Sequence, residues 1–149
     1  MARGRPELIA IGPDDYHAEH VGRTSEELQF FLTTPFEPVI GGNKGCEYVI
    51  LFLFDTHGNL VEAQIDSFGP GDSMNKQERR RCYEQRLIEL GELSKGRIEI
   101  KPFAVERFNT TFGLVPREPE DDDDEWAVEL QPGNYMAFFE PWDSGEYDT

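Results

Sequence analysis

The feature that most constrains the fold of this chain is a run of seven apolar residues, YVILFLF, at positions 48–54. Because successive side chains of a strand point to opposite faces, such a run predicts a strand that is buried on both faces. The next five residues, DTHGN, are turn formers, and Val61, Ala63 and Ile65 then alternate with polar residues. The segment therefore predicts a β-hairpin whose first strand is covered on both sides.

One main helix is predicted over residues 75–90. Asn75 and Glu78 have the spacing of a capping box, and Gly91 is a typical residue for ending a helix. An apolar stripe at helical spacing lies between them, made of Tyr83, Leu87 and Leu90. The other positions of this segment are strongly charged, so we expect the helix to lie on the surface of a sheet.

Shorter strand patterns fill most of the remaining chain. They cover residues 29–34, 97–101 with a continuation over 103–105, 112–115, 126–130 and 135–139. A capping pattern at Thr24 and Glu27 also allows a helix over residues 28–32, but aromatic and β-branched residues before Pro35 favour the strand. We therefore expect an α+β fold, with a largely antiparallel sheet of about six to eight strands and one main amphipathic helix packed on a face.

Length and composition bound the class of protein. The 149 residues are expected to form a single domain over residues 1–149. The two cysteines, Cys46 and Cys82, are too few for a disulfide framework or a zinc site. Neither an apolar run of about 18 residues for a membrane span nor the long apolar segment of a signal peptide is present. We therefore expect a cytoplasmic protein that has no membrane partner and needs no cofactor.

The charge of the chain is concentrated near its C-terminus. The net charge is −16, and residues 118–149 contain 12 acidic residues and no lysine or arginine. This imbalance argues against binding to nucleic acids or anionic membranes, because phosphate contacts need cations. The run EPEDDDDE at residues 118–125 predicts an acidic, mobile loop, and the segment EPWDSGEYDT at residues 140–149 is expected to be irregular.

Carboxylates beside aromatic residues favour a contact surface for a basic partner protein. We therefore expect a non-enzymatic binding module, of the inhibitor, immunity or adaptor type. The candidate contact residues are Asp121, Asp122, Asp123, Asp124, Trp142 and Tyr147. For the two aromatic residues, the alternative is that the C-terminal segment folds back to cover a sheet edge or to complete the core.

A second interpretation is a small metal-dependent hydrolase. His17 and His20 would share one face of a helix and could bind a metal together with Asp15 or another nearby carboxylate. On a strand the two imidazoles would point to opposite faces, and ordinary surface histidines are the simpler interpretation. The sequence contains no nucleophile elbow of the form G-x-S-x-G, so an enzyme is not favoured.

Three consecutive arginines, Arg79, Arg80 and Arg81, lie in the first half of the predicted helix, where cations oppose the helix dipole. We expect compensating acids, either from the acidic loop at residues 118–125 or from glutamates of the helix itself. Such local pairs contribute only ~0.2–0.5 kcal/mol each. A third function, a pocket between helix and sheet where the arginines bind a small anionic ligand, also fits this pattern.

Overall fold

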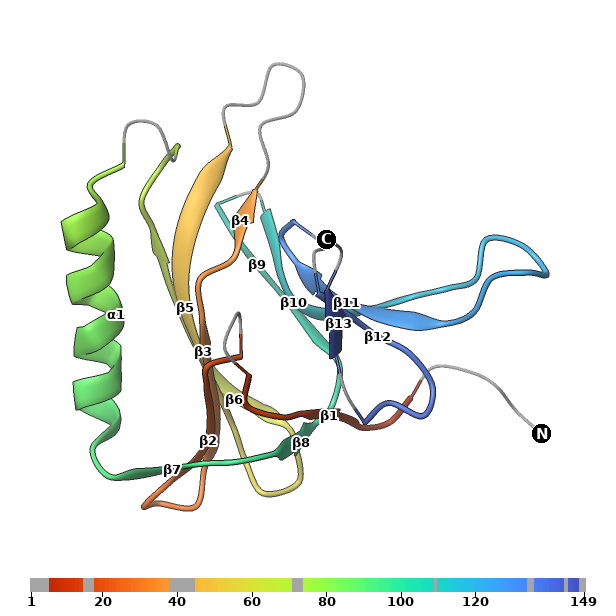
Figure 1. Cartoon of the computed structure of the whole chain (residues 1–149), viewed down its shortest axis with the longest axis horizontal. Coiled ribbons are helices and arrows are strands. Elements are labelled where there is room, and N and C mark those ends of the chain that lie inside the picture. The colour runs from red at the N-terminus through yellow and green to blue at the C-terminus, as the bar shows by residue number, and fades with distance from the viewer. Residues whose placement is uncertain are drawn as a thin grey trace.

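The structure is a computed structural model that describes residues 6–14, 18–37, 45–70, 74–108, 110–133, 136–143 and 145–147. Within them the chain forms one helix and thirteen strands (Figure 1). The elements are β1 (Ile9–Ile11), β2 (His20–Thr24), β3 (Gln29–Thr33), β4 (Phe36–Glu37), β5 (Cys46–Phe54), β6 (Leu60–Ser67), α1 (Lys76–Leu90), β7 (Leu93–Lys95), β8 (Ile98–Ile100), β9 (Phe103–Arg107), β10 (Thr110–Arg117), β11 (Ala127–Gln131), β12 (Met136–Phe138) and β13 (Gly145–Tyr147).

The predicted α+β class is confirmed, because every strand pairing described is antiparallel and one helix accompanies the sheets. The predicted number of strands is too low. In the largest sheet β5 pairs with β3, β4 and β6, and β3 continues through β2 to β7. A second sheet has the order β13-β12-β11-β10-β9, and β1 pairs with β8. Most of the extra strands have only two or three residues, too few to show an alternating pattern.

The predicted hairpin is formed by β5 and β6, with Ile50 opposite Ile65. Its turn is held by the Asp55 carboxylate, whose Oδ1 accepts the backbone N–H groups of His57 and Asn59, each at 2.9 Å. As expected, β5 is covered on both faces. Its side chains enter two different hydrophobic clusters, Val49 and Leu51 in one, and Tyr48, Ile50, Phe52 and Phe54 in the other.

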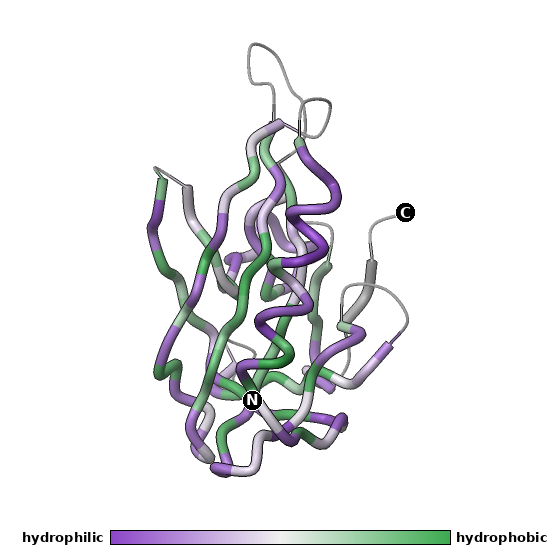
Figure 2. Tube along the Cα trace, turned by 90° about the vertical axis from the view of Figure 1, so that its left-hand side faces the viewer, coloured by the Kyte–Doolittle hydropathy of each residue, from purple (hydrophilic) through white to green (hydrophobic). Residues whose placement is uncertain are grey.

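The helix α1 begins where the capping pattern predicts. The side chain of Asn75 accepts the N–H groups of Gln77 and Glu78, and Gly91 ends the helix with a φ of 72°. No helix residue is fully buried. The contact with the sheet is made by half-buried side chains, Cys82, Tyr83, Leu87 and Leu90, which pack against Phe30, Leu32, Val49 and Leu51. Figure 2, with α1 toward the viewer, shows a mostly hydrophilic helix in front of strands with long hydrophobic stretches.

The larger core joins the two main sheets. Aromatic side chains of β5 meet those of the five-stranded sheet edge to face, with ring centroids 4.8 Å apart for Tyr48 and Phe112 and 4.7 Å apart for Phe52 and Phe103. The protein is therefore layered, with α1 on one side of the large sheet and the five-stranded sheet on the other (Figure 1). In the described part of the chain, the helix is neither long nor apolar enough to cross a membrane.

The two acidic segments behave differently. Residues 118–125 connect β10 to β11 without regular structure, as expected, and their mobility stays a prediction. The expectation that residues 140–149 are irregular is wrong for Gly145–Tyr147, which form β13 and pair with β12, Tyr147 lying opposite Met136. The three residues lie at the edge of the five-stranded sheet, where pairing with β12 gives their backbone hydrogen-bonding partners.

Candidate functional site: an acidic cleft with two tryptophans

The acidic loop at residues 118–125 is folded around one aspartate. Asp124 Oδ2 accepts from the Arg117 guanidinium at 2.7 Å and from the Glu120 N–H at 3.0 Å, and Oδ1 accepts from the Glu125 N–H at 2.9 Å. Arg117 also binds Glu129 of β11 at 2.8 Å. The backbone bond from Glu120, followed by Arg117 and then Glu125, lowers the pKa of Asp124 to about 2. Asp124 is therefore charged near neutral pH and connects the loop to β10.

Trp142 forms the opposite side of the site. Its backbone N–H donates to the Phe139 carbonyl at 2.7 Å, and its own carbonyl accepts from the N–H of Ala10 in β1 at 2.9 Å. The indole is half-buried and packs against the larger core. Two backbone hydrogen bonds and the packing of the indole against the core therefore fix the position of Trp142.

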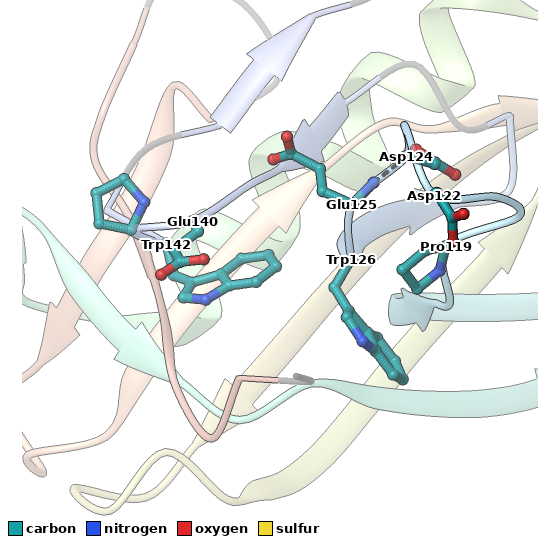
Figure 3. Close-up of a pocket in the computed structure, with 8 residues that line it drawn as sticks. Pro119, Asp122, Asp124, Glu125, Trp126, Glu140 and Trp142 are labelled. Carbon is teal, nitrogen blue, oxygen red and sulfur yellow. Dashed lines mark hydrogen bonds between the residues drawn. The ribbon is translucent and has the colours of Figure 1, made fainter. Parts of the chain in front are cut away.

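Between these two segments lies a cleft of about 540 Å³, which we call the acidic–aromatic cleft (Figure 3). It is lined by Pro119, Asp122, Asp124, Glu125, Trp126, Glu140, Pro141 and Trp142. The chain has only two tryptophans, and both are in this lining. Figure 3 shows Trp126 with the acidic loop on one side of the cleft and Trp142 with Glu140 on the other.

The carboxylates of the acidic–aromatic cleft are unequal. Asp124 is paired with Arg117, whereas none of the cations in the described residues forms an ion pair with Asp122, Glu125 or Glu140. Within the part of the chain that the structure describes, three carboxylates without an ion-pair partner therefore lie beside the two indole rings. Such a surface attracts cations, and most strongly cations that also present apolar area to an aromatic face.

Some of the predicted contact residues come together here and others do not. Asp122, Asp124 and Trp142 line the same cleft. Asp121 and Asp123 instead border a separate cavity next to Arg117 and Glu129. The backbone of Tyr147 is in β13, but the described residues do not include its side chain.

Glu125, Trp126 and Glu140 also line the cleft, but they are not among the contact residues predicted from the sequence. Trp126 reads as the first inward residue of an alternating strand, but β11 begins one residue later and Ala127 and Val128 are both fully buried. The available signal was the position of Trp126 directly after the acidic run, which places an aromatic side chain close to several carboxylates.

The acidic loop does not cover the arginines of α1, contrary to one expectation. The loop projects on the far side of the sheets from α1 (Figure 1). The helix arginines pair closer by: Arg79 with Glu47 of β5, and Arg80 with Glu84 at 3.9 Å in the next turn. Arg79 and Arg80 line a different cavity, which also contains His20, whereas Arg81 is not part of its lining.

The predicted metal site lies only partly in the described residues. His17 and Asp15 are outside them, so the pairing of His17 with His20 stays a prediction. His20 is at the start of β2, and its Nδ1 lies 2.5 Å from the hydroxyl of Tyr83 on α1. In the part of the chain that the structure describes, no three His, Cys, Asp or Glu side chains are arranged to hold a metal ion.

Comparison with known proteins identifies no relative. No protein-family model, no curated protein and no solved structure matches the chain. The function must therefore be argued from the residues of the chain and their arrangement.

Proposed function

We propose that this protein is a non-enzymatic binding module that engages a basic partner protein through the acidic–aromatic cleft. A lysine or arginine side chain of the partner would enter between Trp126 and Trp142. The observation that carries the proposal is the grouping of both tryptophans around one cleft with three carboxylates that form no ion pair with any described cation.

The size and lining of the cleft support a side chain as the bound group. Its volume of about 540 Å³ is within the range of roughly 300–1,000 Å³ that is usual for ligand sites. A cation over an indole face gains ~0.5–2 kcal/mol, depending on how far it is desolvated. Arginine fits best, because its planar guanidinium can stack on an indole while its N–H groups donate to a carboxylate.

The charge distribution supports fast association. The net charge of the chain is −16, and most of it lies in the segment that forms the cleft. A strongly negative surface steers a basic partner toward itself, and added salt screens this attraction. We therefore expect the tryptophans to contribute mainly to affinity and the carboxylates mainly to the association rate.

Intrinsic fluorescence tests the proposal directly, because the only two tryptophans are in the cleft. The probe is a tetra-arginine amide peptide, and the control is a tetraglycine amide peptide of equal length. We expect the arginine peptide to produce a saturable change in emission, with an affinity that falls as salt is added. An emission spectrum that does not respond to the arginine peptide at low salt would overturn the proposal.

Two variants with equal changes of charge separate the cleft from general attraction. The cleft variant replaces Asp122 by Asn and Glu125 and Glu140 by Gln. The control variant replaces three exposed glutamates that lie outside the cleft, Glu26, Glu62 and Glu106, by Gln. We expect the cleft variant to weaken binding severalfold more than the control. Equal weakening in both variants would show that net charge alone attracts the peptide.

A further inference from the structure

A second cavity, of about 390 Å³, lies between the start of β2 and the helix α1. It is on the opposite side of the molecule from the acidic loop (Figure 1). His20, Arg79, Arg80 and Tyr83 contribute to its lining, and Leu87 adds apolar surface. The helix that supplies four of these five side chains carries five cations and three carboxylates, so it is positively charged within an otherwise acidic protein.

The contact between His20 and Tyr83 determines what the imidazole can offer a ligand. The Tyr83 hydroxyl lies 2.5 Å from His20 Nδ1, and a neutral imidazole can either accept the O–H at this nitrogen or donate its own N–H to the hydroxyl oxygen. A hydrogen-bond acceptor at Nε2 selects the first tautomer, in which Tyr83 donates to Nδ1 and Nε2 carries the proton. Burial, and after it the positive charge of Lys95, lowers the pKa of His20 and favours this neutral form. Toward an anion, Nε2 of His20 thus acts as a hydrogen-bond donor, while Nδ1 accepts from Tyr83.

The two arginines that border the cavity differ in how firmly they are held. Arg79 is bound by Glu47 of β5, and its side chain is 31% exposed. Arg80 is 82% exposed, and its ion pair with Glu84 is long, at 3.9 Å. A pair of this kind contributes little and exchanges readily with water. The Arg80 guanidinium is therefore available to an incoming acceptor, while Arg79 adds a fixed positive charge.

We propose that this cavity binds a small organic phosphate monoester. The phosphate oxygens would accept from Arg80 and from Nε2–H of His20, and the organic group would lie against Tyr83 and Leu87. A phosphate suits the site because its oxygens can accept bidentate bonds from the Arg80 guanidinium, and the neighbouring Arg79 adds positive charge. Glu19 and Glu84 also border the cavity and oppose an anion, so the expected affinity is in the millimolar range.

The test is a titration of the ¹⁵N-labelled protein, in which NMR follows the ring nitrogens of His20 and the Nε–H signals of the arginines. Phenyl phosphate is the probe, inorganic phosphate tests the charge without the organic group, and benzyl alcohol tests the ring without the charge. We expect saturable shifts at His20 and Arg80 with phenyl phosphate, weaker binding of inorganic phosphate, and no binding of benzyl alcohol. Failure of phenyl phosphate to produce saturable shifts in the millimolar range would overturn the proposal.

Two neighbouring arginines provide a matched pair of variants. Arg80→Gln removes the available guanidinium, whereas Arg81→Gln removes an equal charge from an exposed residue that does not line the cavity. We expect Arg80→Gln to weaken phenyl phosphate binding by roughly tenfold or more, as the loss of a charge-assisted hydrogen bond predicts, and Arg81→Gln to weaken it far less. Equal weakening would mean that the anion is attracted to the helix as a whole, which contradicts a site.

Discussion

Lowering the pH tests whether Asp124 organises the acidic loop. Its two oxygens accept the N–H groups of Glu120 and Glu125 and the Arg117 guanidinium, and these bonds lower the pKa of Asp124 from 3.8 to about 2. At pH 3, about nine-tenths of such a group is ionised, whereas about one-seventh of an ordinary aspartate would be. Because the folded-state pKa is the lower one, this contribution to loop structure is complete above pH 3.8 and is lost as the pH falls toward 2.

The measurement is an NMR titration of the backbone amide protons of Glu120 and Glu125. We expect both signals to remain constant down to about pH 3 and then to shift with one common midpoint near 2. Arg117→Gln should raise the midpoint but keep it below 3.8, since the two backbone donors remain. Asp122→Asn is the control and should leave the midpoint nearly unchanged. A midpoint near 3.8 in the unaltered protein would refute the assignment of Asp124 as the centre of the loop.

Three further predictions concern the remainder of the fold. Burial lowers the pKa of His20, so the neutral imidazole stabilises the fold fully above pH 6.5, and this stabilisation is lost as the pH decreases below 6.5. Urea unfolding should therefore show that acid lowers the stability of His20→Gln less than that of the unaltered protein. A Cβ at Gly22 would collide with the Ser94 carbonyl of β7, so Gly22→Ala should lower the free energy of unfolding by about 1–3 kcal/mol. Gly96→Ala is the control and should change this free energy little, because a Cβ at Gly96 has no atom within 4 Å. Burial raises the pKa of Cys82 to about 11, so at pH 8 only about one thiol in a thousand is ionised, and mass spectrometry should find Cys82 alkylated much more slowly in the folded protein than in urea.

The parts of the fold that could be predicted are those that local rules determine. The hairpin of β5 and β6 and the helix α1 were predicted because apolar spacing, turn residues and the Asn75 cap lie within a few positions of each other. The short strands could not be found in this way. Ile9 of β1, for example, pairs with Ile100 of β8, and a three-residue strand is specified by such a distant partner rather than by its own pattern.

For the candidate site, only the kinds of residue involved, acidic and aromatic, could be predicted from the sequence, and their arrangement could not. Four consecutive aspartates look equivalent in the sequence, but Asp124 is close enough to Arg117 to become part of the fold, whereas Asp122 has no cationic partner among the described residues and lines the cleft. Which carboxylate takes which role depends on where β10 ends relative to the loop. The position of the end of β10 relative to the loop is set by the folded structure and cannot be derived from the spacing of residues along the sequence.

Local ion pairs also explain why the contact between the acidic loop and the basic helix, which charge alone predicted, does not form. Each segment has opposite charges much closer in the fold: Arg117 for the loop, and Glu47 and Asp66 of the large sheet for the helix. Charges paired in this way are already used to hold elements together. The charges available for binding are those that such pairing leaves over or holds only weakly. Among the described residues they include Asp122, Glu125 and Glu140 beside the tryptophans, and Arg80, with its long ion pair, beside His20. Because the sheets separate the two proposed sites, the carboxylates of the cleft form no ion pair with Arg80, and each site keeps its own charge.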